Sequence, residues 1–576
     1  MQTTLARPDC NRPLKAAIPS GLPVPDPLPA AAEILGQRRQ AQIIWAFVLL
    51  GVVVRSIRFL LRFPLWPDEA FLAHNYLDRG YWDLLQPLDF YQVAPFLYLW
   101  VQQTFIKLFG FSELTLRLYV FLGGIGSLLL FRHLAGRLLR GTALVLAVAA
   151  FAVAYPLIRY SAEAKPYGSD MFVSLALLTL AVEWCRRPQD RRWWCALTLA
   201  VPVAMMLSYP AMFVAGGISL TMAAVLRKRG SWRDWLCWGI TNLAICAGFA
   251  ALFACCGGSQ MASVGGSMRA SWSYTFPPLT SPAKLAVFLL WSHTSDGLAY
   301  PTGGAMGAST LTTLCCVTAV VLLIRGRRFS VAALCLTPLA LNFVASAMHC
   351  YPYGGHPRFL LYMGPIFCLL TGLGAAGLAA ALRRRQWSAA IPVIGILTLF
   401  ALIGIGCPIR DFLKPYKEPC WMRNRDLARW FWSDKAIDAE LVCLRNDLGR
   451  RFYSPQEGDD LASVYYCNQR IYSPRHARRE PAHLDRVSQT RPLRCVRFRP
   501  TCTSPRDEAA FRDWLLGMQS TYQLVAAEKF PMSFYVYDEL VYVDPVEVYE
   551  FVPKGPDRNS SASLQGLPSP SAPTAR

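Results

Sequence analysis

The chain has 576 residues, of which 54% are hydrophobic and only 16% are charged, and its mean hydropathy is +0.28. Soluble domains usually carry roughly 25% charged residues, so this composition argues against an ordinary soluble enzyme. The formal net charge is +21. In a compact soluble domain that excess would suggest a nucleic-acid partner, but in a membrane protein basic residues mark the cytoplasmic loops, and we expect no nucleic acid here.

The first 40 residues are rich in proline and predict a disordered cytoplasmic leader, 1–40. Apolar runs follow, and about 20 such residues in a helix cross the hydrocarbon core of a bilayer. The runs are 41–61, 93–109, 114–133, 142–158, 169–184, 194–208, 211–226, 236–256, 310–324, 329–347, 358–381 and 389–406. The sequence therefore predicts a polytopic membrane protein.

Clusters of arginine and lysine between these runs decide which of them cross the membrane. If the leader and the cluster around Arg132 are both inside, only one crossing fits between Leu61 and Arg132. The run 93–109 is short and places Gln103 and Lys107 on one helix face, so we interpret it as an amphipathic helix on the outer membrane surface. The prediction is about 11 spans in a plasma (inner) membrane, with the N-terminus cytoplasmic and the C-terminus outside.

This topology divides the chain into a transmembrane domain, 41–406, and an extracytoplasmic α/β domain, 407–555, before a disordered tail, 556–576. The outer loops are 62–113, 159–168, 257–309 and 348–357. In the C-terminal domain AELVCL, RCVRF, SFYVY and EVYEFVP have strand character, and RDEAAFRDWLLGM predicts a helix. The C-terminal region also holds cysteines that permit disulfides without establishing them. They are Cys407, Cys420, Cys443, Cys467, Cys495 and Cys502.

Ionisable side chains gather in the outer loops rather than in the middle of the spans. Ion-coupled transporters and channels usually need charges deep in the bilayer, yet the runs 142–158, 211–226 and 389–406 hold none. This distribution favours a reaction on a lipid head group over conduction through the membrane.

Three outer segments carry the candidate chemistry. Asp68 and Glu69 follow Trp66-Pro67, and they fit either the charged first turn of a helix or a reactive carboxylate site. The second segment, RYSAEAKPYGSD, and the third, HCYPYGGHPRF, supply cations and polar groups that a phosphate would need. The candidates for binding a phosphate-linked donor are Arg159, Lys165, Tyr167, His349, His356 and Arg358.

Taken in order, four stretches resemble the GT-C superfamily of integral-membrane glycosyltransferases. They are WPDEAFLAHN, VAPFLYLWVQQTFIKLFGFSELTLRL, RYSAEAKPYGSD and YPYGGHPRFLLYMGP, within residues 41–410. The resemblance is closest to the branch with protein O-mannosyltransferases, the lipid A aminoarabinose transferase and rhizobial lipopolysaccharide sugar transferases. Ala94 stands where that family often has a proline, and Lys165 where it often has an arginine.

The resemblance implies a sugar donor linked to polyprenyl phosphate and an acceptor hydroxyl on a glycan, lipid or protein at the outer face. Asp68 matches the general base of an inverting displacement, Glu163 matches the second acidic position, and Glu69 is a candidate helper. Lys165 and Arg358 would neutralise the leaving phosphate. No cofactor is certain; a divalent cation, Mg²⁺ or Mn²⁺, held by Asp68 and Glu163 stays open.

Two other functions stay open on the sequence alone. A lipid-linked-sugar flippase or transporter would move head groups without forming a glycosidic bond. A membrane-anchored binding protein would place its function in residues 407–576. Neither explains acidic and basic residues in several loops that return to one interface. In the glycosyltransferase reading, the aromatic loop 257–309, with Trp272 and Trp291, helps to define the substrate pocket.

Overall fold

The computed structural model describes residues 29–188, 190–301, 304, 307, 309–383, 390–413, 440–444, 471, 490–498, 505–536 and 539–554. The chain divides into two compact units. The first comprises Met1–Pro419 with Pro455–Ile471, and the second comprises Cys420–Ser454 with Tyr472–Arg576.

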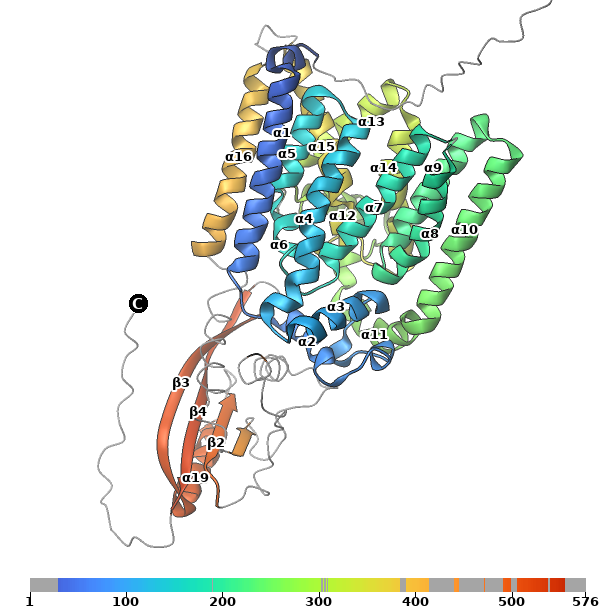
Figure 1. Cartoon of the computed structure of the whole chain (residues 1–576). Coiled ribbons are helices and arrows are strands. Elements are labelled where there is room, and N and C mark those ends of the chain that lie inside the picture. Colours follow the sequence, from blue (N-terminus) through green and yellow to red (C-terminus); the bar gives the residue numbers. More distant parts are fainter. Residues whose placement is uncertain are drawn as a thin grey trace, which may run out of the picture. The chain divides into compact units, whose positions relative to one another are not determined.

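Helices make up the described part of the first unit (Figure 1). They are α1 (Pro29–Leu60), α2 (Pro67–Asp78), α3 (Phe96–Phe109), α4 (Glu113–Leu138), α5 (Gly141–Val153), α6 (Tyr155–Tyr160), α7 (Tyr167–Arg186), α8 (Arg191–Leu207), α9 (Ala211–Arg229), α10 (Trp232–Leu252), α11 (Gly258–Ser271), α12 (Pro282–Thr294), α13 (Thr310–Arg325), α14 (Phe329–Ala347), α15 (Gly364–Arg383) and α16 (Ala390–Leu413). A 3₁₀ segment, η6 (Pro357–Met363), leads into α15.

Within the described residues, 7 helices are long and apolar enough to cross a membrane. They cover Gly36–Leu60, Glu113–Leu138, Tyr167–Arg186, Trp232–Ser263, Phe329–Ala347, Pro357–Leu382 and Ala390–Leu413. Shorter apolar helices cover Gly141–Val153, Ala211–Arg227 and Thr310–Arg325. The remaining predicted span coincides with α8, so the predicted all-α polytopic membrane fold is confirmed.

Helix α3 takes a different direction from the predicted spans. Figure 1 shows it running across one end of the helical unit, beside α2 and close to α11, whereas α4 runs lengthwise. The interpretation of 93–109 as a non-spanning helix agrees with this placement. The polar face of α3 is partly turned inward, because Gln103 is 5% exposed and donates a hydrogen bond to the carbonyl oxygen of Arg79 (3.0 Å). Lys107 remains exposed and lies over the ring of Tyr81.

The core of this unit is built on α5, where every residue from Val145 to Val153 is buried. Small residues let its neighbours approach closely. A Cβ atom added to Gly372 of α15 would lie 2.3 Å from the backbone nitrogen of Ala147, which no side chain could tolerate. The contact between α5 and α15 therefore requires glycine at position 372.

Three predicted boundaries differ from the structure. Residues 29–40 belong to α1, with a break at Gly36, and are not part of a disordered leader; positions 1–28 and the predicted tail 556–576 lie outside the described residues. The run 142–158 is interrupted at Ala154, just before Pro156. Helix α16 continues past the predicted run 389–406 to Leu413, so Cys407 lies in this apolar helix rather than in the C-terminal domain.

The second unit contains a four-stranded sheet in the order β1-β2-β4-β3. The strands are β1 (Glu440–Leu444), β2 (Leu493–Phe498), β3 (Tyr522–Val536) and β4 (Glu539–Pro553). Strands β1 and β2 are parallel and the other pairs are antiparallel. Helix α19 (Pro505–Thr521) packs Phe511 and Trp514 against Phe551 and the buried, free Cys495. The predicted α/β character is confirmed.

Candidate active site

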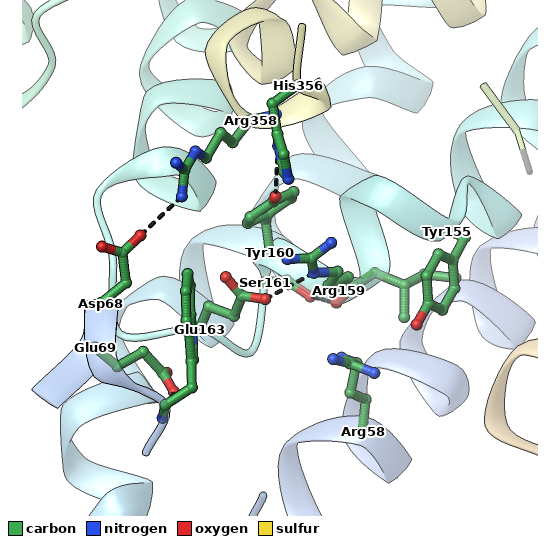
Figure 2. A network of polar contacts seen from close by, with 12 residues as sticks. Arg58, Asp68, Glu69, Tyr155, Arg159, Tyr160, Ser161, Glu163, His356 and Arg358 are labelled. Atoms are coloured by element: carbon green, nitrogen blue, oxygen red, sulfur yellow. Dashed lines mark hydrogen bonds and ion pairs between the residues drawn. The ribbon is translucent and has the colours of Figure 1, made fainter. Parts of the chain in front are cut away.

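Helix α2 begins directly after Trp66, and its first turn carries the adjacent carboxylates Asp68 and Glu69. The two side chains have different surroundings. Glu69 is fully buried, and its Oε2 accepts a hydrogen bond from the backbone nitrogen of Trp66 (3.4 Å). Asp68 keeps 27% of its side chain exposed. Figure 2 shows the two carboxylates pointing in different directions.

Glu69 belongs to a buried ion pair with Arg117 of α4. Arg117 donates from Nε to Oε1 (2.8 Å) and from Nη2 to Oε2 (2.5 Å). The same Oε1 accepts the backbone N–H of Ala164 (2.6 Å). Glu69 thus joins α2, α4 and the loop between α6 and α7, which is the structural role of a capping and bridging carboxylate rather than of an accessible base.

Asp68 faces two cations that come from other parts of the chain. Its Oδ2 accepts a hydrogen bond from Nη1 of Arg358 (2.7 Å), which is 290 residues away in sequence and lies on η6. Its Oδ1 lies 3.9 Å from Nζ of Lys165 in the loop between α6 and α7. Both cations are less than a tenth exposed. The structure thus brings Asp68, Lys165 and Arg358 together at one point, and Figure 2 shows the carboxylate of Asp68 facing Arg358.

Lys165 is held by an uncharged partner as well. Its Nζ donates to Oε1 of Gln92, a buried residue, at 2.5 Å. Burial lowers the pKa of the Lys165 ammonium from its ordinary value, and the charge of Asp68 offsets part of that shift. A phosphate ligand would supply further negative charge and would favour the protonated ammonium.

Glu163 is paired with Arg159, four residues earlier. The Nε of Arg159 donates to Oε1 of Glu163 at 2.8 Å, and both side chains are nearly buried. The charge of Arg159 is therefore already balanced in the structure. The other carboxylate oxygen of Glu163, Oε2, is buried and has no hydrogen-bond partner in the described part of the chain.

Aromatic and imidazole groups surround Arg358. Its Cζ lies 5.9 Å from the ring centroid of Tyr167 and 4.5 Å from that of Trp272. His356 stabilises the turn before it, because its Nδ1 accepts the backbone N–H of Arg358 (3.3 Å) and contacts the hydroxyl of Tyr160 (3.3 Å). His356 and Tyr167 thus lie at the predicted site and shape the position of Arg358.

His349 is placed differently from the other predicted donor-binding residues. It has a backbone φ of 57° in the turn after α14, and its ring centroid lies 5.0 Å from that of Phe276 in the segment 257–309. Among the described contacts none joins His349 to Asp68 or to the cations beside it. Its predicted role in donor binding stays a prediction.

The sequence did not single out Gln92 or the pairing of Arg117 with Glu69. A neutral glutamine in a loop gives no charge or periodicity signal. Arg117 is the arginine of FSELTLRL, in one of the stretches that carry the resemblance. That position was the sequence signal that could have identified it. Trp272 belongs to the loop that was expected to shape the pocket, and its contact with Arg358 agrees with that expectation.

The site residues do not fit a divalent cation. Among the described residues there is no group of three or more His, Cys, Asp or Glu side chains that could hold a metal ion. The carboxylate of Asp68 faces Arg358 and Lys165, while Glu163 is paired with Arg159. Hard cations bind where several oxygen ligands converge, and here each candidate oxygen pair faces positive charge.

A sequence model of the dolichyl-phosphate-mannose-protein mannosyltransferase family matches residues 93–254. The predicted resemblance to GT-C membrane glycosyltransferases is confirmed. No curated protein matches the chain significantly.

The chain is similar to solved structures of two other proteins. ArnT from Cupriavidus metallidurans, bound to undecaprenyl phosphate, has 15% sequence identity and a TM-score of 0.46, with 88% of this chain and 97% of that chain covered. The apo oligosaccharyltransferase from Archaeoglobus fulgidus has 11% identity and a TM-score of 0.42, with 75% of this chain and 64% of that chain covered.

Proposed function

We propose that this protein is a membrane glycosyltransferase that moves a sugar from a polyprenyl-phosphate-linked donor to an acceptor hydroxyl, with Asp68 as the general base. One observation carries the proposal. Of the three candidate carboxylates, Asp68 is the one that stays partly exposed, at 27%, while two buried cations from separate loops face it. A carboxylate and a pair of cations at one point are what this displacement requires.

In the proposed reaction the acceptor oxygen attacks the anomeric carbon of the sugar. Asp68 takes the proton of the acceptor hydroxyl, the new carbon–oxygen bond forms, and the bond to the phosphate oxygen breaks. The leaving polyprenyl phosphate keeps the electron pair. A single displacement of this kind inverts the anomeric centre.

The ion pairs of Asp68 have a direct bearing on its role as a base. The guanidinium of Arg358 already occupies the Oδ2 atom of Asp68, at 2.7 Å. A donor phosphate carries negative charge and competes for the same guanidinium and for the ammonium of Lys165. Donor binding would then release Asp68 toward the acceptor while placing both cations on the leaving group.

Buried polar atoms without partners support a ligand at this point. The Nε of Arg358 and the Oε2 of Glu163 are buried and lack hydrogen-bond partners in the described part of the chain. A buried polar atom without a hydrogen-bond partner destabilises the folded protein, so a ligand that pairs with such an atom gains binding free energy. A phosphate oxygen suits Arg358 Nε, and a sugar or acceptor hydroxyl suits Glu163 Oε2.

We place this reaction on the extracytoplasmic face of the membrane. The site lies at the first residues of α7, whereas Arg186 ends that helix. Near that end, the buried Oε1 of Glu183 lies 2.6 Å from Nε of Arg137 and 4.0 Å from Nη1 of Arg186. Basic clusters mark the cytoplasmic side, so the opposite helix ends, which carry the site, would face outward. The acceptor is then a glycan, lipid or protein of the cell envelope.

The decisive experiment measures sugar transfer by the purified full-length protein carrying Asp68→Asn. The donors are a panel of polyprenyl-phosphate sugars, and glycosidic product is measured. Loss of a general base typically costs 10²- to 10⁴-fold in rate, about the size of loss we expect. Asp83→Asn is the matched control: Asp83 lies in the same outer loop, and its Oδ2 accepts only the local backbone N–H of Gly80 among the described contacts. Near-wild-type transfer by Asp68→Asn would refute the assignment.

The same preparation separates the proposal from the flippase alternative. Reconstituted in vesicles, a flippase would move a lipid-linked sugar to the other leaflet without forming product, and would do so with asparagine at position 68. Product formation that requires Asp68 is incompatible with that function.

A further inference from the structure

Helix α11, in the outer loop 257–309, carries a glutamine that fixes a neighbouring backbone segment. Gln260 is fully buried. Its Oε1 accepts the backbone N–H of Ala94 (3.2 Å) and its Nε2 donates to the carbonyl oxygen of Ala94 (3.1 Å). The hydroxyl of Tyr209 also donates to Gln260 Oε1 (2.8 Å). The backbone N–H of Ala94 depends on this side chain, since loss of the amide would leave it buried without that partner, whereas the carbonyl oxygen of Ala94 also accepts from the hydroxyl of Tyr209 (3.3 Å).

The segment that Gln260 fixes also holds Lys165. Gln92 precedes Ala94 by two residues, and its Oε1 accepts the hydrogen bond from Lys165 Nζ (2.5 Å). The Nε2 of Gln92 donates to the carbonyl oxygen of Phe90 (2.9 Å), so the amide oxygen is the atom that faces the ammonium. A shift of the backbone at Ala94 would therefore move the acceptor that orients Lys165.

The other end of α11 reaches the second cation. Trp272 follows the last residue of the helix, Ser271, and its ring centroid lies 4.5 Å from Cζ of Arg358. The ring of Phe359 flanks the same guanidinium at 5.1 Å and meets Trp272 edge-on. A guanidinium over an aromatic face keeps its N–H edge available, and here Nη1 donates to Asp68.

We propose that α11 is a positioning element that holds Lys165 and Arg358 at the separation the donor phosphate requires. Lys165 and Arg358 contact the phosphate, whereas Gln260 and Trp272 act through them. One helix, about 20 Å long, connects Gln260 to Trp272. The outer loop therefore sets the positions of Lys165 and Arg358 together. This inference rests on the proposed function for the identity of the phosphate.

The first test follows Lys165 without any need for sugar transfer. The purified full-length protein is treated with an amine-acylating reagent across a pH series, and modification of Lys165 is quantified by peptide mass spectrometry. An acceptor such as Gln92 Oε1 favours the charged ammonium, so Gln260→Ala should shift the half-modification point of Lys165 to lower pH. Ser259→Ala is the matched control, because Ser259 lies in the same helix and its hydroxyl donates to the carbonyl oxygen of Cys256.

The second test follows Arg358 through the affinity for undecaprenyl phosphate in detergent. Trp272→Ala should weaken binding about 3- to 10-fold, because the loss of one cation–π contact has roughly that effect. Trp272→Phe keeps an aromatic face and should bind close to the wild-type affinity. If Trp272 had only a general packing role, its replacement would lower the stability of the protein, but Trp272→Ala and Trp272→Phe would bind undecaprenyl phosphate with the same affinity.

Both effects are required. If the Lys165 profile of Gln260→Ala matches that of Ser259→Ala, or if Trp272→Ala binds undecaprenyl phosphate as Trp272→Phe does, the inference is overturned. Should Gln260→Ala fail to fold, Gln260→Met keeps the length of the side chain but removes both the acceptor and the donor that face Ala94, and the same shift is expected. A wild-type protein that binds the lipid phosphate but transfers no sugar would refute the proposed function, while the Lys165 profile would still decide on α11.

Discussion

Replacing Glu69 by glutamine tests whether the second of the two adjacent carboxylates is structural. Glu69 accepts hydrogen bonds from Nε and Nη2 of Arg117 and from the backbone nitrogens of Ala164 and Trp66. The glutamine side chain has the same shape but no charge, and its NH₂ group would face one set of these donors. Breaking one partner of a buried ion pair costs about 3–5 kcal/mol, so Glu69→Gln should destabilise the protein by an amount in that range.

The neighbouring substitution Asp68→Asn supplies the comparison. Asp68 is more exposed, and asparagine keeps a side-chain oxygen that can accept the hydrogen bond from Arg358, so Asp68→Asn should cost less stability than Glu69→Gln. Unfolding of both variants is measured in detergent by tryptophan fluorescence, beside the sugar-transfer assay. Glu69→Gln should be clearly less stable than the wild type. Asp68→Asn should be almost as stable as the wild type but should lose sugar transfer. Wild-type stability of Glu69→Gln together with loss of transfer would refute the structural role and restore Glu69 as a participant in the chemistry.

Three further predictions concern the cations and the metal. Burial lowers the pKa of Lys165, and its charged form binds phosphate, so the rate of transfer should fall with rising pH at a lower pH than for an ordinary lysine. In a pH–rate profile, Lys165→Arg should move that fall to higher pH. Arg358→Lys should lower transfer about 10- to 100-fold in steady-state assays, since an ammonium cannot reproduce the planar contacts with Trp272 and Asp68; full activity would show that charge alone is enough. Exhaustive EDTA treatment should leave transfer near its initial rate, and a loss restored by Mg²⁺ or Mn²⁺ would show that Asp68 and Glu163 bind a metal despite their ion pairs.

The membrane architecture could be derived from local sequence properties. Uninterrupted apolar runs and basic clusters are enough to predict spans, because the cost of burying charge in a bilayer is large and acts on each segment separately. The same reasoning excluded 93–109 from the spans, in agreement with the transverse placement of α3. Boundaries were less accurate: the polar start of α1 and the end of α16 are helical without being long apolar runs.

Composition and apolar runs were enough to predict a polytopic membrane protein with acidic and basic groups in the loops between its spans, and the resemblance named Asp68 as the leading carboxylate. The partners of each group followed from the tertiary structure alone. Successive helix residues point about 100° apart, so neighbours such as Asp68 and Glu69 face different surroundings, and their spacing in sequence cannot say which. The pairing of Asp68 with Arg358 and of Glu69 with Arg117 depends on how η6 and α4 pack against α2, and such long-range packing has no local signature.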